Sequence, residues 1–249
     1  MKQGLWRALG LLVAAALALQ FFFLARIALA ATVDPQSTAF QRSEAWRLAQ
    51  AKGTLRWRQQ WMPYERISDH LKRAVIASED DSFSSHEGVD WEALEKAWER
   101  NAQAEERAAR QKPRAAKRAH SQAARAPKIV GGSTITQQLA KNLLLSGERT
   151  MLRKGQEFVL AFALERMLSK ERILEIYLNS VEWGEGVFGA EAAARHYYRK
   201  SAAQLSAYES ARLAVMLPRP KYFEKLPNSG YLASRAWTIV ARMRAADLP

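Results

Sequence analysis

The chain of 249 residues contains no cysteine, which excludes disulfides and zinc sites built from thiolates. Its four histidines show no metal-binding spacing, and no glycine-rich loop ends in the Gly-Lys-Ser/Thr of a P-loop. Glycine and proline are few from residue 61 onward, and no stretch alternates apolar and polar residues as a half-buried strand would. These absences point to an all-α protein.

Acidic residues are also in short supply: 25 Asp and Glu stand against 38 Lys and Arg, which gives a formal net charge of +13. Nucleic acid is the usual partner for such a charge. The N-terminus argues against it, because residues 8–25 form an uncharged apolar run that Arg26 interrupts and residues 27–31 extend. At about 1.5 Å per residue, a helix of this length spans a bilayer core of roughly 30 Å.

The apolar run has two interpretations, a retained membrane anchor and a cleaved signal peptide with a cleavage site at Ala28-Leu29-Ala30. We favour the anchor, because the apolar core of a signal peptide is only about 7–15 residues long. Lys2 and Arg7 precede the run and place the N-terminus in the cytoplasm by the positive-inside rule. The remaining chain then lies outside the cytoplasm, where its basic charge meets anionic lipid instead of nucleic acid.

We expect a cytoplasmic tail over 1–7, an anchor over 8–31, a polar connector over 32–60 and one domain over 61–249. Within the connector, only residues 43–51 suggest a short helix. Apolar residues at helical spacing predict that the domain is all-α. The predicted helices cover 68–78, 90–100 and beyond, 134–145, 151–168, 170–179, 189–198, 206–216 and 231–246.

The segment 101–128 differs in composition from the rest of the domain. From Arg100 to Lys128, nine positive and two negative residues give a net charge of +7. Core-forming residues are almost absent, which predicts a flexible loop or a frayed helix extension. One hypothesis places this basic segment on an anionic membrane, and the alternative is a solvated insertion.

The segment from Gly131 to Asn142 reads Gly-Gly-Ser-Thr-Ile-Thr-Gln-Gln-Leu-Ala-Lys-Asn and opens a predicted helix. One face of that helix carries Thr134, Gln138, Lys141 and Asn142. Free N–H groups at a helix N-terminus and a lysine on the same polar face suit an anionic ligand rich in oxygen. An ordinary Ser/Thr cap on a surface helix is the alternative.

Two further charged clusters have both a functional and a structural interpretation. Glu79-Asp80-Asp81 ends an apolar helix, where acids oppose the helix dipole and raise one another's pKa. The cluster is either a general base or a solvated acidic turn. Arg153-Lys154-Gly155-Gln156-Glu157 is either a surface ion-pair group or a cationic clamp for phosphate.

Taken in this order, these blocks resemble the peptidoglycan glycosyltransferase family, which also forms the first domain of class A penicillin-binding proteins. The resemblance covers residues 61–220. The sequence contains no Ser-x-x-Lys motif of a transpeptidase, so it resembles the monofunctional members of the family. Five ordered blocks are specific, although each alone is weak. The residues that carry it are Glu79-Asp80-x-x-Phe83-x-x-His86-x-Gly88, the segment 131–142, Arg153-Lys154-x-x-Glu157, the block 173–189 with Glu175, Tyr177, Asn179, Gly184, Gly186 and Gly189, and Ala214-x-x-Leu217-Pro218-x-Pro220.

The resemblance implies an all-α, lysozyme-like domain in two lobes behind an N-terminal transmembrane helix. It implies that the enzyme polymerises lipid II, an undecaprenyl-pyrophosphoryl disaccharide pentapeptide, into glycan strands, with inversion at MurNAc C1. Glu79 matches the family's base, and Glu157 its second catalytic glutamate. The residues implied to bind substrate are Asp80, Phe83, Ser133, Thr134, Gln138, Lys141, Asn142, Arg153 and Lys154, and those implied to be structural are His86, Gly88, Gly131 and Gly132.

The resemblance also implies a divalent cation, Mg²⁺ or Mn²⁺, with Glu157 as a candidate ligand. It implies membrane lipids and other cell-wall synthases as partners, no nucleic acid, and the bacterial inner membrane with the catalytic domain in the periplasm. Phe83 is expected toward the bilayer. Two features depart from the family pattern: the basic segment is long, and Tyr197-Tyr198-Arg199-Lys200 replaces the usual Tyr-Phe-Gly-Lys, which puts the local turn in doubt.

Two rival functions remain at this point. A lysozyme-like hydrolase or lytic transglycosylase would cut glycan and needs an acid for the leaving sugar oxygen. The cations at Lys141 and Arg153 argue against it, because a cut sugar leaves no pyrophosphate. A membrane-anchored binding protein for anionic lipid or nucleic acid would use the basic segment, but it would not require five ordered blocks.

Overall fold

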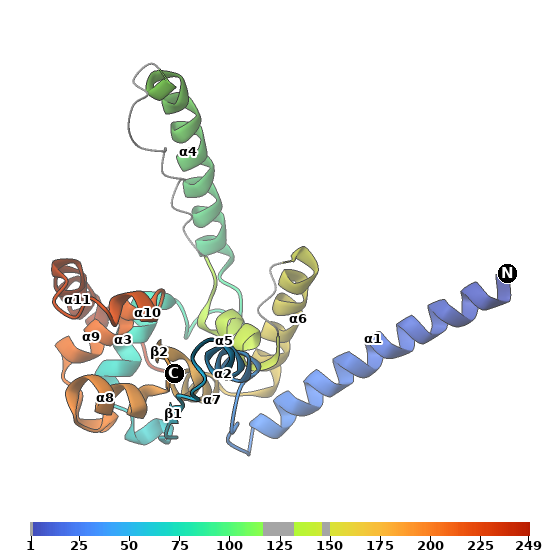
Figure 1. Ribbon diagram of the computed structural model, residues 1–249, viewed down its shortest axis with the longest axis horizontal. Coiled ribbons are helices and arrows are strands. Elements are labelled where there is room, and N and C mark those ends of the chain that lie inside the picture. Colours follow the sequence, from blue (N-terminus) through green and yellow to red (C-terminus); the bar gives the residue numbers. More distant parts are fainter. Residues whose placement is uncertain (1, 117–131, 146–149) are drawn as a thin grey trace.

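The computed structural model describes residues 2–116, 132–145 and 150–249, and it is predominantly helical, as the sequence predicts (Figure 1). The elements in chain order are α1 (Lys2–Ala30), α2 (Ala39–Lys52), β1 (Arg58–Gln59), the 3-10 helix η1 (Tyr64–Arg66), α3 (Asp69–Glu79), α4 (Trp91–Ala116), α5 (Ile135–Leu144), α6 (Met151–Met167), α7 (Lys170–Ser180), β2 (Glu182–Gly184), β3 (Val187–Phe188), α8 (Ala190–Tyr198), η2 (Ala202–Gln204), α9 (Ala207–Met216), α10 (Pro220–Phe223), α11 (Gly230–Arg242) and η3 (Met243–Ala245).

The predicted helix starts are accurate because hydroxyl residues cap them. Thr134 caps α5 and Ser206 caps α9, each within a capping box whose third residue returns a side-chain hydrogen bond. Thr150 and Ser169 accept a backbone N–H at the starts of α6 and α7. Each cap satisfies a donor that would otherwise be orphaned and fixes where the helix begins.

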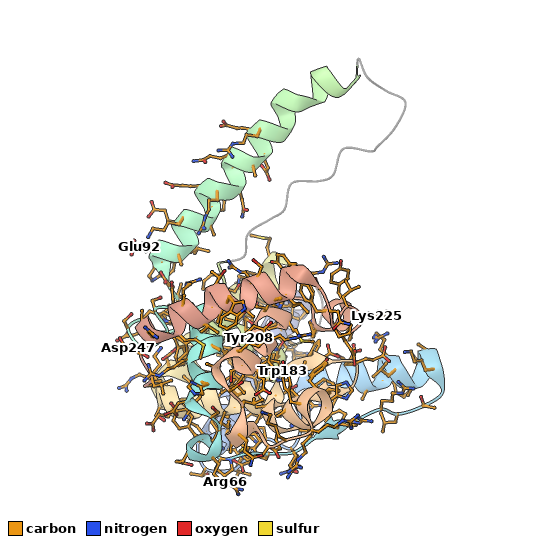
Figure 2. The ribbon with its side chains drawn as sticks, turned by 90° about the vertical axis from the view of Figure 1, so that its left-hand side faces the viewer. Arg66, Glu92, Trp183, Tyr208, Lys225 and Asp247 are labelled. Atoms are coloured by element: carbon orange, nitrogen blue, oxygen red, sulfur yellow. The ribbon has the colours of Figure 1, made fainter. Side chains whose placement is uncertain are left out.

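The helices form two groups around a continuous apolar core. On one side α3 packs against α9 and α11, and on the other α5 packs against α6, α7 and α2 (Figure 1). Tyr177 of α7 and Trp183 of β2 are fully buried in the core between them, and Figure 2 labels Trp183 within the body of the molecule. The predicted site residues lie at the C-terminal end of α3 and the turn after it, at the entrance to α5 and along it, and in the N-terminal half of α6.

A small sheet is present that the sequence analysis did not anticipate. Strand β3 pairs in parallel with β1 and antiparallel with β2, in the order β1-β3-β2. The strands are two or three residues long, which is too short for an alternating pattern to show in the sequence. The expectation of a domain without strands is therefore wrong in this detail, although the fold class stands.

The segment expected to be a connector, 32–60, is part of the folded body. Helix α2 packs on α5, Leu48 is fully buried, and Gln41 Nε2 donates to the carbonyl of Ser180 at 3.0 Å. Strand β1 follows within the same segment. The sequence concealed this because α2 is largely polar, so the few residues that it buries form no apolar stripe.

Helix α4 projects from the body and continues through Ala116 (Figures 1 and 2). The first part of the segment 101–128 is therefore the helix extension that the sequence allowed, and residues 117–128 lie outside the described part of the chain. At the base of α4, the ring of Trp91 stacks on Phe158 of α6, with 6.3 Å between centroids. This contact joins the start of α4 to the helix that carries Arg153 and Glu157.

Residue Arg199, where the family resemblance leads us to expect glycine, forms the turn that ends α8. Arg199 ends α8 in the left-handed conformation with φ 59° and is, in the described part of the chain, the one non-glycine residue with positive φ. A side chain in this region is strained by about 1 kcal/mol. The arginine thus costs some stability at a turn whose backbone conformation favours glycine.

Helix α1 is long and apolar enough to cross a membrane by length and composition, and its C-terminal end rests on the body. Phe23 and Ile27 are buried there. Gln20, which is the polar side chain within the run 8–25, exchanges two hydrogen bonds with Gln156 of α6, at 2.8 and 2.9 Å. A paired amide removes the cost of a polar group beside lipid and fixes the rotation of α1 on α6.

This docking makes a direct prediction for the full chain in lipid. Because the protein lacks cysteine, Gln20→Cys with Gln156→Cys creates a single thiol pair. A short bis-maleimide should cross-link that pair rapidly, with the product read as a mobility shift after proteolysis between the two sites. The control pair, Leu12→Cys with Gln156→Cys, places the first thiol about 12 Å further along the helix and should not react. Equal yields from both pairs would contradict the docked position.

Candidate active site

Glu79 is the last residue of α3, and it lines a cavity of about 120 Å³. Gln138 of α5 donates a hydrogen bond from Nε2 to Glu79 Oε2 at 3.1 Å. Burial raises the pKa of Glu79 and the charge of Asp80 adds to the effect, whereas Gln138 and Lys141 act in the opposite direction. A carboxylate with a raised pKa beside a cavity is suited to accept a proton from a substrate hydroxyl.

Asp80, predicted to contact substrate, lines the same cavity as Glu79 and also fastens the acidic turn to α5. Its side chain is only 2% exposed, and it bonds to His86 Nε2 at 2.9 Å. The backbone N–H of Ile135, at the start of α5, donates to the other carboxylate oxygen at 2.9 Å. A carboxylate at a helix N-terminus is favourable. The second acid of the cluster thus fixes the distance between α3 and α5.

Two more residues predicted to contact substrate are buried, and of these Thr134 lines the same cavity as Glu79. Phe83 is 0% exposed, so it faces the core and not the bilayer, and the ammonium of Lys170 lies 4.6 Å from its ring centroid. The hydroxyl of Thr134 accepts from Gln137 N at 3.1 Å and donates to the carbonyl of Gly88 at 2.7 Å. With both of these bonds made, the Thr134 hydroxyl serves the turn and leaves no donor for a ligand.

The glycines predicted to be structural lie at close contacts. Gly88 has φ +86°, and a Cβ there would approach Cγ of Glu165 to 3.0 Å. A Cβ on Gly132 would lie 3.1 Å from Cβ of Ala97, where the chain enters α5 beside α4. Gly131 falls outside the described residues.

A cationic cluster stands on the first turns of α6. Glu157 is 3% exposed, and its carboxylate bonds to Arg153 Nη1 at 3.0 Å and to the ammonium of Lys154. Lys154 also donates to Ser133 Oγ at 3.3 Å, which joins α6 to the entrance of α5. Two cations share one carboxylate, so the cluster keeps net positive charge at the position where α5 begins.

The cations face a second, larger cavity of about 680 Å³. Gln138 lines this cavity and donates a hydrogen bond to Glu79, which lines the smaller one, so one side chain links the carboxylate to the larger cavity. The predicted site residues that line the smaller cavity are Glu79, Asp80, Gly132, Ser133 and Thr134. The predicted site residues that line the larger cavity are Gln138, Lys141, Asn142, Arg153 and Lys154. The arrangement is that of a base next to an anion site.

The donor set offers no ready place for a protein-held metal. Over the described ranges, no group of three His, Asp or Glu side chains lies together. Both oxygens of Glu157 are engaged by Arg153 and Lys154, so this carboxylate has no free face toward a cation. The surroundings of Glu157 therefore do not suit a metal ligand. We assign no step of the reaction to a metal held by the protein.

Sequence reasoning missed two residues near the cavities. Tyr177 has no assigned role within the block 173–189, and its hydroxyl donates to Gln138 Oε1 at 3.0 Å. Glu182 lines the larger cavity and lies 3.3 Å from the ammonium of Lys221. No pattern identified Glu182, because a single acid after a buried helix has no signature. The signal for Tyr177 was its hydroxyl on the apolar face of α7, next to Ile173, Leu174 and Ile176.

The environment of Glu182 makes stability depend on pH. Burial raises its pKa to about 7, against a lowering by Lys221, and the charge of Glu44 adds to the rise. Because the folded-state pKa lies above the unfolded value of 4.5, this contribution to stability is complete below pH 4.5 and is lost as pH rises through 7. The expected loss is about 3 kcal/mol.

We expect the melting temperature of the wild type to fall relative to Glu182→Gln between pH 5 and pH 8, because the amide cannot ionise. Thermal unfolding in detergent at several pH values measures this difference. Glu185→Gln, an exposed neighbour whose pKa is lowered by Lys52, is the control and should not show the same trend. Parallel curves for wild type and Glu182→Gln would contradict the expectation.

A family model and similar curated proteins point to the same family. The family model described as "Transglycosylase" matches residues 47–110 and 112–244, beginning within α2. A protein of Burkholderia thailandensis named "Biosynthetic peptidoglycan transglycosylase" is 51% identical over 240 residues, covering 96% of this chain and 86% of the relative. A protein of the same name from Burkholderia orbicola is 51% identical over 233 residues, covering 94% and 86%.

Proposed function

The chain belongs to the transglycosylase family, and from that premise we propose that it polymerises lipid II into glycan strands. It is a peptidoglycan glycosyltransferase of cell-wall synthesis. The observation that carries the detailed proposal is that Glu79 lines one cavity and is hydrogen-bonded to Gln138, which lines a second cavity together with the cations of α6. A base beside an anion site is what transfer from a lipid pyrophosphate requires.

In the proposed reaction, Glu79 takes the proton of the acceptor's GlcNAc 4-hydroxyl. The oxygen forms a bond to C1 of the donor's MurNAc on the face opposite the pyrophosphate. The C1–oxygen bond to the pyrophosphate breaks, and the leaving group carries away the electron pair. Inversion from α to β follows from attack on that opposite face.

Charge develops on the pyrophosphate as it leaves, and the cations on α5 and α6 are placed to stabilise it. Lys141, Arg153 and Lys154 line the same cavity. Glu157 holds the latter two in place through both of its oxygens and so acts as a positioning residue. Glu157 thus orients the two cations and does not itself transfer a proton. Ser133 and Asn142 are proposed to bind sugar and phosphate oxygens.

We propose that a divalent cation binds to the substrate and not to a site on the protein. Mg²⁺ or Mn²⁺ would accompany the pyrophosphate, since the carboxylate of Glu157 is already engaged by two cations. The corresponding expectation is that activity responds to the cation supplied, without a tightly held metal copurifying with the protein.

We also propose the bacterial inner membrane as the location, with α1 as a single anchor and the domain in the periplasm. The length and composition of α1 support this, and Lys2 and Arg7 favour a cytoplasmic N-terminus. Membrane lipids are then direct partners of α1. Binding to other cell-wall synthases stays a prediction, and we do not expect the protein to bind nucleic acid.

The test supplies the full chain in detergent with labelled lipid II and, separately, with intact peptidoglycan. Polymeric glycan should appear from lipid II, and no soluble fragments should be released from peptidoglycan. Release of fragments without polymer would support the glycan-cutting alternative and overturn the proposal.

A further inference from the structure

The hydroxyl of Tyr177 is linked to the proposed base through one side chain, that of Gln138. Tyr177 is 0% exposed and sits in the middle of α7. Its hydroxyl donates to Gln138 Oε1 at 3.0 Å, and Gln138 Nε2 donates to Glu79 Oε2 at 3.1 Å. Three side chains from α7, α5 and α3 thus form one chain of hydrogen bonds that ends on the carboxylate.

The direction of this hydrogen-bond chain is fixed by chemistry. An ionised carboxylate only accepts, so Gln138 must present its N–H₂ group to Glu79. The amide oxygen then points to Tyr177, whose hydroxyl is able to donate. Burial, followed by the nearby charges of Glu79 and Asp80, raises the pKa of Tyr177 well above its ordinary value, so the hydroxyl keeps its proton.

The backbone around Tyr177 is held firmly enough to act as a reference point. Asn179, two residues later and fully buried, accepts from Met62 N at 2.8 Å and donates to the carbonyl of Met62 at 2.9 Å. These bonds tie the end of α7 to the chain before α3. A small displacement of Tyr177 is therefore opposed by buried contacts on both sides.

We infer that Tyr177 is a positioning residue for the reaction: through Gln138, it keeps an N–H donor directed at Glu79 and so holds the base ionised and correctly oriented. No role in the reaction had been assigned to it. The inference rests on the proposed function, because it gives the carboxylate of Glu79 the task of accepting a proton.

Tyr177→Phe removes only the donating oxygen. Without it, the Gln138 amide can turn its oxygen toward a protonated Glu79, which favours the uncharged form. The charged groups around Glu79 remain, namely Asp80 from its own turn, Lys141 from α5, and the cavity-lining Asp81, Asp90, Arg100 and Arg242. The acid limb of the kcat profile should therefore move up by about one pH unit, so that kcat falls by roughly 10-fold at pH values on that limb, with KM for lipid II little changed.

Tyr197→Phe is the matched control. Tyr197 is also largely buried, and its hydroxyl donates to the carbonyl of Trp183 at 2.8 Å, away from Glu79. The same oxygen is lost, so stability should fall by a comparable amount. The acid limb of the pH profile should stay where it is in the wild type.

A double-mutant cycle separates positioning from a merely structural role. In a Gln138→Ala background, Tyr177→Phe should have almost no further effect on kcat, because the route to Glu79 is already broken. An equal fold-loss from Tyr177→Phe with and without Gln138 would overturn the inference. An unmoved acid limb in folded Tyr177→Phe would overturn it as well.

A titration without substrate keeps this test separate from the proposed function. The Glu79 carboxylate can be followed by infrared difference spectra, with Glu79→Gln identifying its band. A higher pKa of Glu79 in Tyr177→Phe than in the wild type supports the relay even if lipid II is not the substrate, and an unchanged pKa contradicts it. Polymerisation by the wild type decides the proposed function independently.

Discussion

Glu79→Gln is expected to abolish glycan synthesis, with turnover of lipid II lowered by about 10³-fold. Glutamine keeps the shape of the side chain but cannot take a proton from the acceptor hydroxyl. Binding of lipid II should persist, because the cations at the larger cavity are untouched. Initial rates of polymer formation by wild type and variant at equal concentration give the comparison.

The rate of the wild type should also depend on the ionisation of Glu79. Only the carboxylate form can act as a base, so the rate should fall as pH drops through a pKa that burial places above 4.5. The residual rate of Glu79→Gln should lack this limb. Glu87→Gln, an exposed acid on the same turn, is the matched control and should retain the rate of the wild type.

If Glu79→Gln kept more than about a tenth of the rate of the wild type, another group would be taking the proton. The assignment would then have to move to a different residue of the cavities. A variant that lost binding and turnover together would instead point to a role in holding the substrate.

The second large effect is expected from Glu157→Gln, with turnover lowered by about 100-fold. The carboxylate is buried and balances Arg153 and Lys154, so its loss leaves two adjacent cations that repel each other. Both KM and kcat for lipid II should worsen, because the cations no longer meet the pyrophosphate in the correct geometry. Steady-state kinetics with lipid II in detergent or liposomes measures both.

Glu165→Gln is the matched control on the same helix, since that carboxylate is also mostly buried and pairs with Lys170. Its melting temperature should fall, while turnover should change far less than in Glu157→Gln. The pH profile distinguishes the roles of the two glutamates in the site. An acid limb that disappears in Glu157→Gln, instead of in Glu79→Gln, would mean that Glu157 is the titrating base.

The fold class and most helices could be predicted from the sequence because local signals specify them. Caps such as Thr134 and Ser206 coincide with the starts of helices. The small sheet and helix α2 could not be predicted, since short strands and a largely polar helix acquire their stability from neighbours distant in sequence. Tertiary contacts, such as the hydrogen bond between Gln41 and Ser180, show that this segment belongs to the body.

The sequence predicted which residues form the site, but it did not predict the role of each one. Motif order brought together Glu79, Gln138 and the Arg153–Glu157 cluster, which the structure places around two cavities. The sequence could not show which polar groups were already satisfied by their neighbours. Asp80 and Phe83 proved to support the turn, and Tyr177 proved to be in contact with the site, because each outcome depends on which side of a helix or turn faces the core.

The most direct measurement of the central claim records binding and turnover of labelled lipid II on the same samples of full-length wild type and Glu79→Gln. The wild type should bind lipid II and convert it into polymer with release of the lipid pyrophosphate. Glu79→Gln should bind lipid II within about threefold of the affinity of the wild type and form no polymer. Polymer from Glu79→Gln at a rate close to that of the wild type would contradict the account.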